Sequence, residues 1–320
     1  MLSPSKLACC ALTMNLLAPA VFAAGQQMLQ IDVAGQQRDY ILVTPDAMPT
    51  GSRPLVLLLH GHIGTAANAL GAGLAPSPLS AWLDIADREK IWLVALQGLK
   101  GSDYRTGWRD CRSDDMRNPN ADDVAFADAV AHALIAAGRV DPKRLYVMGM
   151  SNGAIMSYRL ALEMTPTPAA IAAVSGTMAA RADCTRNARP VSVLLIHGTD
   201  DPIVPYAGGG VGFGRRRVSE VLGAEATRDF WLRVDGLTAA VPTSYTFPHL
   251  AADDTTAVRT RYGSDTGPQV EFIAIERGGH VEPSLQFHYG TFYSHLVGRQ
   301  NRDFESAEEA WRFFAGKRGG

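Results

Sequence analysis

Short apolar runs alternate with amphipathic stretches along most of the chain. The apolar runs stand at residues 55–59, 91–96, 144–148, 170–174, 191–196 and 270–275. Continuous aliphatic runs of this length are typical of strands buried on both faces of a parallel sheet. The stretches between them predict helices at residues 79–90, 121–138, 154–162, 219–235 and 306–314. Strands that alternate with helices predict an α/β fold: a doubly wound, mostly parallel sheet with helices on both faces.

Three further segments stand outside this alternation. Residues 28–33 and 38–44 predict two strands joined as a hairpin, and residues 97–120 are polar and irregular. Residues 208–214 are rich in glycine, but they lie in a loop rather than at a strand-to-helix turn. We therefore expect a mobile loop beside the site and not a dinucleotide-binding fingerprint.

The first residues have the pattern of a secretory signal peptide. Lys6 gives a short positive region, residues 7–17 are apolar but too few to span a bilayer, and small residues lead up to Ala23. We expect residues 1–23 to be the signal peptide and residues 24–320 to form a single domain. The protein is then secreted or periplasmic, without membrane contact once the signal is removed.

Charge and cysteine content narrow the function classes. The net charge of −2 gives no reason to expect a nucleic acid as partner. The chain has four cysteines, of which Cys9 and Cys10 leave with the signal peptide. Cys111 and Cys184 remain, and two cysteines in an oxidising compartment predict one disulfide. Two unpaired, buried thiols are the alternative.

The residues after the run at 144–148 predict a nucleophile. Ser151 is the centre of Gly149-Met150-Ser151-Asn152-Gly153, between a strand-like and a helix-like segment. G-x-S-x-G in this context is typical of a nucleophile elbow, in which a sharp turn exposes the serine hydroxyl beside a helix N-terminus. A glycine-rich loop that merely contains a serine is the alternative, and the flanking strand and helix favour the elbow.

A serine nucleophile needs a base, and the base needs an orienting acid. In an open parallel sheet both lie in loops at the carboxyl ends of strands, with the acid before the histidine along the chain. Asp200 and Asp201 follow the run at 191–196, and Asp201 is favoured because Pro202 holds it extended. His280 follows the last apolar run and two glycines. The sequence therefore predicts Ser151, Asp201 and His280 as the catalytic residues.

Backbone amides complete the predicted site. His62 lies just after the first buried run, in Leu59-His60-Gly61-His62. The N–H groups of His62 and Asn152 are predicted to form an oxyanion hole. His60 and His62 also form an H-x-H pair, but no third ligand is clustered with them. Neither a metal nor a cofactor is expected.

Several segments carry a resemblance to a known family. They are Trp108 and residues 59–61, 122–124, 138–142, 149–153, 157–160, 197–199 and 201–206. Together they resemble the secreted polyhydroxybutyrate depolymerase and feruloyl esterase family, which is close to carbohydrate esterase family one. The resemblance covers nearly all of the chain after the signal peptide. It implies an α/β-hydrolase fold, a Ser151–Asp201–His280 triad and ester hydrolysis through an acyl-enzyme.

The chain departs from that family beside the catalytic histidine. The family often has histidine-threonine-tryptophan-proline there, whereas this chain has His280-Val281-Glu282-Pro283. The missing tryptophan changes the expected shape of the acyl or leaving-group pocket. No separate substrate-binding domain follows Phe314, which favours soluble or oligomeric esters over an insoluble polymer. Trp108 is a candidate to stack on a sugar or phenolic ring, with a role in the core or a lid as the alternative.

These observations together predict an exported serine carboxylic ester hydrolase. Its expected substrates are small or oligomeric feruloyl, acetyl-sugar or hydroxyalkanoate esters, among which the sequence does not distinguish. Two other functions are compatible with the same fold. One is a serine peptidase similar to the prolyl peptidases, although those usually carry a large additional domain. The other is an exported binding protein without catalytic activity, against which the complete catalytic set argues.

Overall fold

A computed structural model describes residues 25–319, apart from residues 74–76, 186–188, 215 and 252. The expected signal peptide, residues 1–23, lies outside the described residues. Within the part of the chain that is described, no helix combines the length and apolar character needed to cross a membrane.

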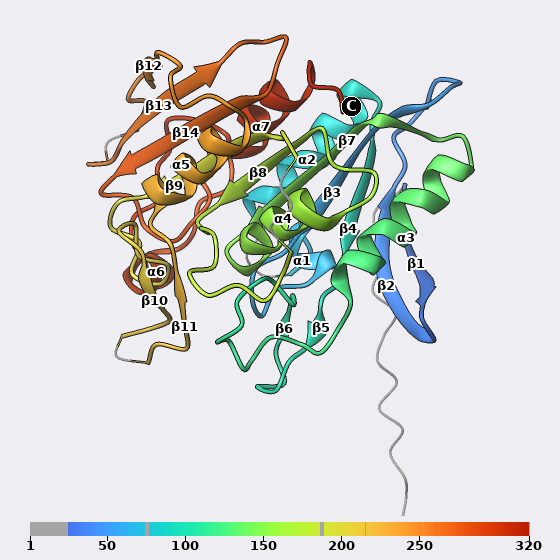
Figure 1. The fold of residues 1–320 in the computed structure, drawn as a ribbon, viewed down its shortest axis with the longest axis horizontal. Helices are drawn as coiled ribbons and strands as arrows, with labels where there is room; N and C mark the ends of the chain where they lie inside the picture. The colour runs from blue at the N-terminus through green and yellow to red at the C-terminus, as the bar shows by residue number, and fades with distance from the viewer. Residues whose placement is uncertain (1–24, 74–76, 186–188, 215, 252, 320) are drawn as a thin grey trace, which may run out of the picture.

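The centre of the molecule is a ten-stranded sheet with the order β1-β2-β4-β3-β7-β8-β9-β14-β13-β12 (Figure 1). Its strands are β1 (Gln26–Val33), β2 (Gln36–Val43), β3 (Arg53–Leu59), β4 (Trp92–Leu96), β7 (Val140–Met150), β8 (Ala170–Val174), β9 (Ser192–Gly198), β12 (Thr243–Thr246), β13 (Thr256–Gly263) and β14 (Gln269–Glu276). The six strands from β4 to β14 in this order are parallel, and the strands at both edges are antiparallel. The parallel centre aligns the carboxyl ends of β3, β7, β9 and β14 along one rim of the sheet.

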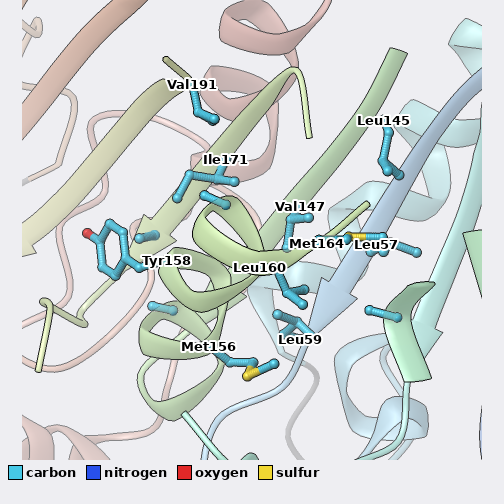
Figure 2. Packing of buried hydrophobic residues seen from close by; sticks show 14 of the residues in the cluster. Leu57, Leu59, Leu145, Val147, Met156, Tyr158, Leu160, Met164, Ile171 and Val191 are labelled. Atoms are coloured by element: carbon cyan, nitrogen blue, oxygen red, sulfur yellow. The ribbon is translucent and has the colours of Figure 1, made fainter. Parts of the chain in front are cut away.

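Helices cover both faces of this sheet. One face packs against α3 (Asp123–Ala136), α4 (Asn152–Glu163) and α5 (Ala224–Val234). The other packs against α1 (Ala66–Ala69), the 3-10 helix η1 (Pro78–Ala81), α2 (Trp82–Glu89) and α7 (Ser306–Phe314). Leu57 and Leu59 of β3 contribute to the first core and Leu58 to the second, because successive side chains of a strand point to opposite faces. Figure 2 shows α4 lying over β3, β7 and β8 in the first core.

The remaining elements are short. The strands β5 (Leu99–Lys100) and β6 (Thr106–Gly107) form one small antiparallel pair, and β10 (Gly209–Val211) and β11 (Ser219–Val221) form another. Helix α6 (Thr291–Val297) lies near β10 in Figure 1. Val297 of α6 and Val211 of β10 share a third, smaller core with Ile155 of α4.

The predicted fold class is confirmed: the sheet is mostly parallel, doubly wound and covered on both faces. Two local predictions were wrong. The helix predicted at residues 219–235 begins only at Ala224, because Ser219 and Val221 point into the protein as strand residues of β11. Residues 208–214, predicted as a mobile loop, instead contain β10, whose ladder with β11 pairs Gly209 with Val221. The sequence reading also missed the antiparallel strands β12 and β13 and the helix α6.

Candidate active site

Ser151 stands in the turn between β7 and α4. Its backbone has φ 56° and ψ −119°, a conformation that residues other than glycine rarely adopt. The Ser151 N–H donates to Val174 O at 2.8 Å. Gly149 and Gly153, on either side of this turn, have no room for a side chain. A Cβ on Gly149 would lie 2.1 Å from Gly153 O, and a Cβ on Gly153 would lie 2.3 Å from Leu59 O. The turn therefore has the geometry of a nucleophile elbow.

A chain of two hydrogen bonds joins the three residues that the sequence predicts as catalytic. Ser151 Oγ lies 2.8 Å from His280 Nε2, and His280 Nδ1 lies 2.8 Å from Asp201 Oδ2. Asp201 follows β9 and His280 follows β14, so both come from loops at the same rim as Ser151. Asp200, the alternative acid, is exposed and its N–H donates to Gly278 O at 2.9 Å. The structure thus brings Asp201, and not Asp200, to the imidazole.

Asp201 is held as a carboxylate. Its Oδ1 accepts the N–H groups of Ile203 and Val204, both at 2.8 Å. Burial alone raises the pKa of this carboxyl group, but the attraction to His280 and His197 and these hydrogen bonds together outweigh burial and lower the pKa below its usual value. A negative charge at this position can orient the His280 imidazole and stabilise its protonated form.

A second imidazole touches the same carboxylate. His197, in β9, is fully buried, and its Nε2 lies 2.9 Å from Val204 O and 3.5 Å from Asp201 Oδ2. Burial lowers the pKa of His197, so the ring is neutral and donates its Nε2–H to the Val204 carbonyl. His197 therefore ties the end of β9 to the loop that carries Asp201.

The loop after β3 lies beside the serine. A Cβ on Gly61 would come within 3.4 Å of Ser151 Cβ, which places the next residue, His62, at the elbow. Asn152 is the first residue of α4, and the N–H groups of a helix's first turn have no partner inside the helix. The loop that carries His62 thus passes beside Ser151, and Asn152 follows the serine directly. The His62 ring lies 2.9 Å from Asp103 Oδ2, and burial lowers the pKa of the ring.

His60 has a structural position and not that of a ligand. It is buried, its Nδ1 donates to Gly61 O at 2.7 Å, and its Nε2 accepts the Gly98 N–H at 3.0 Å. Burial lowers the pKa of His60 to about 4, so the ring is neutral. In the described part of the chain, His, Cys, Asp and Glu form no group of three or more that could hold a metal ion.

The structure places Trp108 in the core, which was the alternative to the predicted stacking on a substrate ring. Its side chain is 0% exposed, its Nε1–H donates to His60 O at 2.7 Å, and its ring centroid lies 4.9 Å from that of His60. No sugar or phenolic ring can stack on a side chain without exposed surface. Trp108 instead supports the loop that leads to His62.

Two carboxylates of the site were missed by sequence reasoning. Asp110 is fully buried and accepts a hydrogen bond from the side chain of Asn152. Glu282, two residues after His280, is also buried, and it accepts from Ser77 Oγ at 3.3 Å and Tyr289 Oη at 3.1 Å. Burial raises the pKa of Glu282. The replacement of the family's tryptophan by Glu282 was the only sequence signal for the second group.

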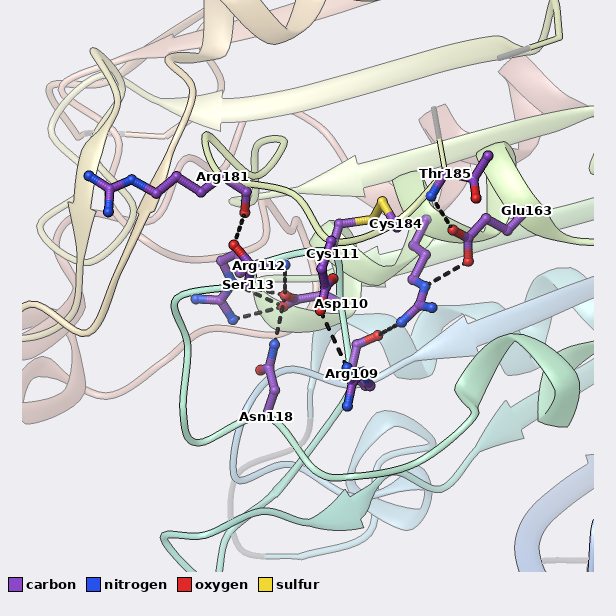
Figure 3. The surroundings of a disulfide bond; sticks show 12 residues. Arg109, Asp110, Cys111, Arg112, Ser113, Asn118, Glu163, Arg181, Cys184 and Thr185 are labelled. Carbon is purple, nitrogen blue, oxygen red and sulfur yellow. Dashed lines mark hydrogen bonds and ion pairs between the residues drawn. A yellow bond between two sulfur atoms is a disulfide. The ribbon is translucent and has the colours of Figure 1, made fainter. Parts of the chain in front are cut away.

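The two remaining cysteines form a disulfide. Cys111 and Cys184 are joined across a sequence separation of 73 residues, with Cα atoms 5.2 Å apart (Figure 3). The bond connects the segment after β6 to the segment after β8. In the entropic model, a link that closes a loop of this length stabilises the folded chain by about 4 kcal/mol.

A large groove lies away from Ser151, Asp201 and His280. It has a volume of about 970 Å³ and is lined by, among others, Thr165, Arg189, Ser192 and Lys317. Ser192 begins β9, whereas Asp201 follows the other end of that strand. The groove is therefore at the opposite rim of the sheet, too far from Ser151 to hold a reacting ester.

Comparisons with known proteins agree with this geometry. Residues 107–211 match the family model described as Phospholipase/Carboxylesterase. The chain is 31% identical to "Putative esterase NocK" of Nocardia uniformis subsp. tsuyamanensis over 297 residues, which are 90% of this chain and 82% of that protein. It is 29% identical to "Feruloyl esterase C" of Emericella nidulans over 54% of this chain and 58% of that protein.

Solved structures show the same fold at low sequence identity. A thermostable esterase superposes with a TM-score of 0.52 and 14% identity, over 92% of this chain and 63% of that one. A variant of pOPH in complex with DMSO superposes with a TM-score of 0.55 and 14% identity, over 95% of this chain and 89% of that one. With the similarity to NocK along most of both chains, these findings show that the protein belongs to the esterases of the α/β-hydrolase type.

Proposed function

We propose that this esterase is an exported serine carboxylic ester hydrolase that works through an acyl-enzyme. The observation that carries the proposal is the continuous hydrogen-bond chain from Ser151 Oγ through His280 to Asp201, with 2.8 Å at both steps. Ser151 has the strained backbone of an elbow nucleophile, and an ionised Asp201 faces the imidazole. Nucleophile, base and orienting acid are thus joined by direct hydrogen bonds.

The proposed reaction has two halves. His280 Nε2 takes the proton of Ser151 Oγ as this oxygen attacks the ester carbonyl, and the N–H groups of His62 and Asn152 bind the oxyanion of the tetrahedral intermediate. The imidazolium then gives the proton to the leaving alcohol, and the acyl group stays on Ser151. Water, activated by the same histidine, attacks the acyl-enzyme and releases the acid. Asp201 remains ionised and stabilises the charged ring in both halves.

The substrate class is proposed on the relatives and on the site. Feruloyl esters come first, because the relatives named feruloyl esterase C align over about half of this chain. The chain spans only 58% of those proteins' length, so their substrate is carried over as a proposal. Acetyl-sugar and hydroxyalkanoate esters, including oligomers of the polyhydroxybutyrate type, are the alternatives. We also propose that residues 1–23 direct export and leave residues 24–320 as one domain, since the Cys111–Cys184 disulfide suits an oxidising compartment.

A panel of soluble esters with these three acyl groups, together with peptide anilides, tests the activity. We expect ester hydrolysis, no peptide cleavage, and covalent labelling of the protein by a fluorophosphonate. Ser151→Ala should lower kcat at least about a thousandfold and abolish labelling. Ser157→Ala is a matched control, because Ser157 is a buried serine of α4 whose Oγ donates to Gly153 O at 2.9 Å. Undiminished hydrolysis by Ser151→Ala would refute the assignment.

A further inference from the structure

We propose that Asp110 is a positioning residue for the oxyanion hole: it fixes the side chain of Asn152 and thereby the direction of the Asn152 backbone N–H. The inference rests on the proposed function, in which that N–H binds the oxyanion. Asp110 itself touches neither Ser151 nor His280 by any contact found among the described residues, so its effect on the reaction passes through Asn152.

Both the oxygen and the NH₂ group of the Asn152 side chain form hydrogen bonds with the loop that contains Trp108 and Asp110. Its Oδ1 accepts the Trp108 N–H at 2.7 Å, and its Nδ2 donates to Asp110 Oδ2 at 2.5 Å and to Trp108 O at 3.3 Å. Asn152 is 5% exposed, so water does not compete for these groups. The first residue of α4 is therefore anchored through its side chain to residues 108–110.

Asp110 decides which way round this carboxamide lies. A carboxylate only accepts hydrogen bonds, so the NH₂ of Asn152 must face Asp110 and its oxygen must face the Trp108 N–H. Without that charge, the NH₂ group and the oxygen could exchange places at smaller cost. The exchanged arrangement sets two donors, the NH₂ group and the Trp108 N–H, against each other and displaces the first turn of α4.

Asp110 is in turn held in place by a buried cation. Arg112 pairs with it through Nη2 at 2.7 Å and Nε at 3.0 Å, and Asn118 Nδ2 donates to Asp110 Oδ1 at 2.9 Å. Arg112 also contacts Ser219 Oγ at 2.7 Å and Asp115 Oδ2 at 2.8 Å. A charge with this many partners is costly to displace, so the carboxylate gives Asn152 a fixed anchor.

The disulfide fixes this segment to the rest of the molecule. Cys111 lies between the two charged residues and is bonded to Cys184, and its carbonyl accepts the Asp183 N–H at 3.0 Å. Two residues on, the Ser113 N–H donates to Arg181 O at 3.0 Å. Figure 3 shows Asp110 next to Arg112 and Asn118 near the disulfide, and Ser113 next to Arg181. The anchor of Asn152 is thereby continuous with the segment after β8.

A misdirected oxyanion donor affects the reaction more than it affects substrate binding. The carbonyl oxygen gains its charge only as the tetrahedral intermediate forms, so the donor acts mainly in the transition state. Loss of the anchor should therefore lower kcat and leave KM nearly unchanged. Complete removal of an oxyanion-hole donor lowers kcat by about a hundredfold to a thousandfold. The decrease in kcat expected here is smaller, because the N–H group is retained.

The test compares Asp110→Asn with Asp115→Asn in the mature, oxidised protein. Asp115 is a matched control, because its side chain is 1% exposed and also pairs with Arg112, but it makes no contact with Asn152 that the structure records. With a soluble ester, we expect Asp110→Asn to lower kcat at least about tenfold with KM within about twofold. Asp115→Asn should lower the melting temperature and keep kcat within about twofold.

Asn152→Ala provides a second route should Asp110→Asn fail to fold. It removes the carboxamide, retains the backbone N–H, and leaves Asp110 paired with Arg112. We expect a loss of kcat at least as large, because Asn152→Ala also removes the two hydrogen bonds to Trp108. We expect no further loss in the Asp110→Asn/Asn152→Ala double variant, because Asp110 acts only through the carboxamide that Asn152→Ala already removes. Unchanged kcat in Asn152→Ala, or multiplied losses in the double variant, would overturn the proposal. A wild-type protein without esterase activity or fluorophosphonate labelling would instead overturn the proposed function.

Discussion

At the scale of single residues, burial and hydrogen bonding give similar side chains different roles. Three of the described histidines, His60, His197 and His280, are buried near the elbow. His60 and His197 are bonded to backbone groups and are neutral because burial lowers their pKa values. His280 alone lies between a hydroxyl and a carboxylate. Proton transfer therefore requires the position of His280, and the other two imidazoles stiffen the loops around it.

His60 gives a stability prediction that depends on pH. Burial lowers its pKa from 6.5 to about 4, so the unfolded chain binds more protons than the folded one as the pH falls below 6.5. Its stabilising contribution is complete above pH 6.5 and is lost towards pH 4. Between pH 7 and 4 we expect the free energy of unfolding to fall by about 3 kcal/mol more in the wild type than in His60→Gln.

The comparison with the variant is necessary because another group titrates in the opposite sense. Burial raises the pKa of Asp235 to about 7, so protonation of this carboxyl group favours the folded state as the pH falls. That contribution is shared by the wild type and by His60→Gln and cancels in the difference. Urea unfolding of both proteins at pH 7 and 4 measures the effect, and an equal decrease in the two would contradict the prediction.

Asp201→Asn should lower kcat by about a thousandfold or more with little change in KM. The Asn oxygen would accept the N–H groups of Ile203 and Val204, as Asp201 Oδ1 does, and the NH₂ group would then face His280. This arrangement favours the wrong tautomer of the imidazole and cannot stabilise its charged form. Steady-state kinetics on a soluble ester measures the change. The exposed neighbour provides the control, and Asp200→Asn should leave kcat nearly unchanged.

At the scale of elements, the site depends on how closely β3, β7 and α4 approach one another. The Cα of Gly153 faces the carbonyl groups of Leu59 and His60, where an added Cβ would lie 2.3 and 2.6 Å from the two oxygens. Ser151 and Gly61 come together because the end of β3 is this close to the start of α4. The same approach sets the distance between the serine and the amide of His62.

Gly153→Ala should therefore separate α4 from β3 and impair both stability and activity. The added Cβ would meet backbone oxygens, which cannot turn away as a flexible side chain can, so the variant should lose about a few kcal/mol of stability. Gly316→Ala is the control, because no atom lies within 4 Å of a Cβ built there. Urea unfolding and fluorophosphonate labelling of both variants measure the two effects. A fully stable and rapidly labelled Gly153→Ala would show that the contact is not limiting.

Elements with a continuous apolar run could be predicted from the sequence, and elements at the edges of the sheet could not. The run at residues 170–174 coincides with β8, because all five of its residues are buried. Strand β13 is only partly buried along most of its length, and β12 is exposed throughout, so neither has such a run. Strand β11 is a three-residue segment whose pairing with β10 depends on contacts that local patterns do not record.

At the scale of the whole molecule, the same contrast applies to the site. Motif and chain order were sufficient to select three residues that the structure joins by hydrogen bonds, Ser151, Asp201 and His280, because each lies within four residues of the end of a strand that the sequence predicts. The burial of Trp108 and the role of Asp110 depend on contacts with residues more than forty positions away, such as Asn152. No local pattern encodes such contacts. These contacts form because the folded chain packs the polar segment at residues 97–120 against the turn that carries Ser151.

The disulfide links the same polar segment covalently to a distant part of the chain. Cys111 and Cys184 enclose both Ser151 and the core strand β8 in one loop with a separation of 73 residues. The entropic model gives about 4 kcal/mol for closing such a loop, so the Cys111→Ser/Cys184→Ser double variant should lose about that much stability. Reduction of the wild type should bring its unfolding midpoint down to that of the variant. A count of free thiols before and after reduction accompanies the measurement, because reduction releases two thiols only if the disulfide is present. Two free thiols in the oxidised protein would contradict the pairing.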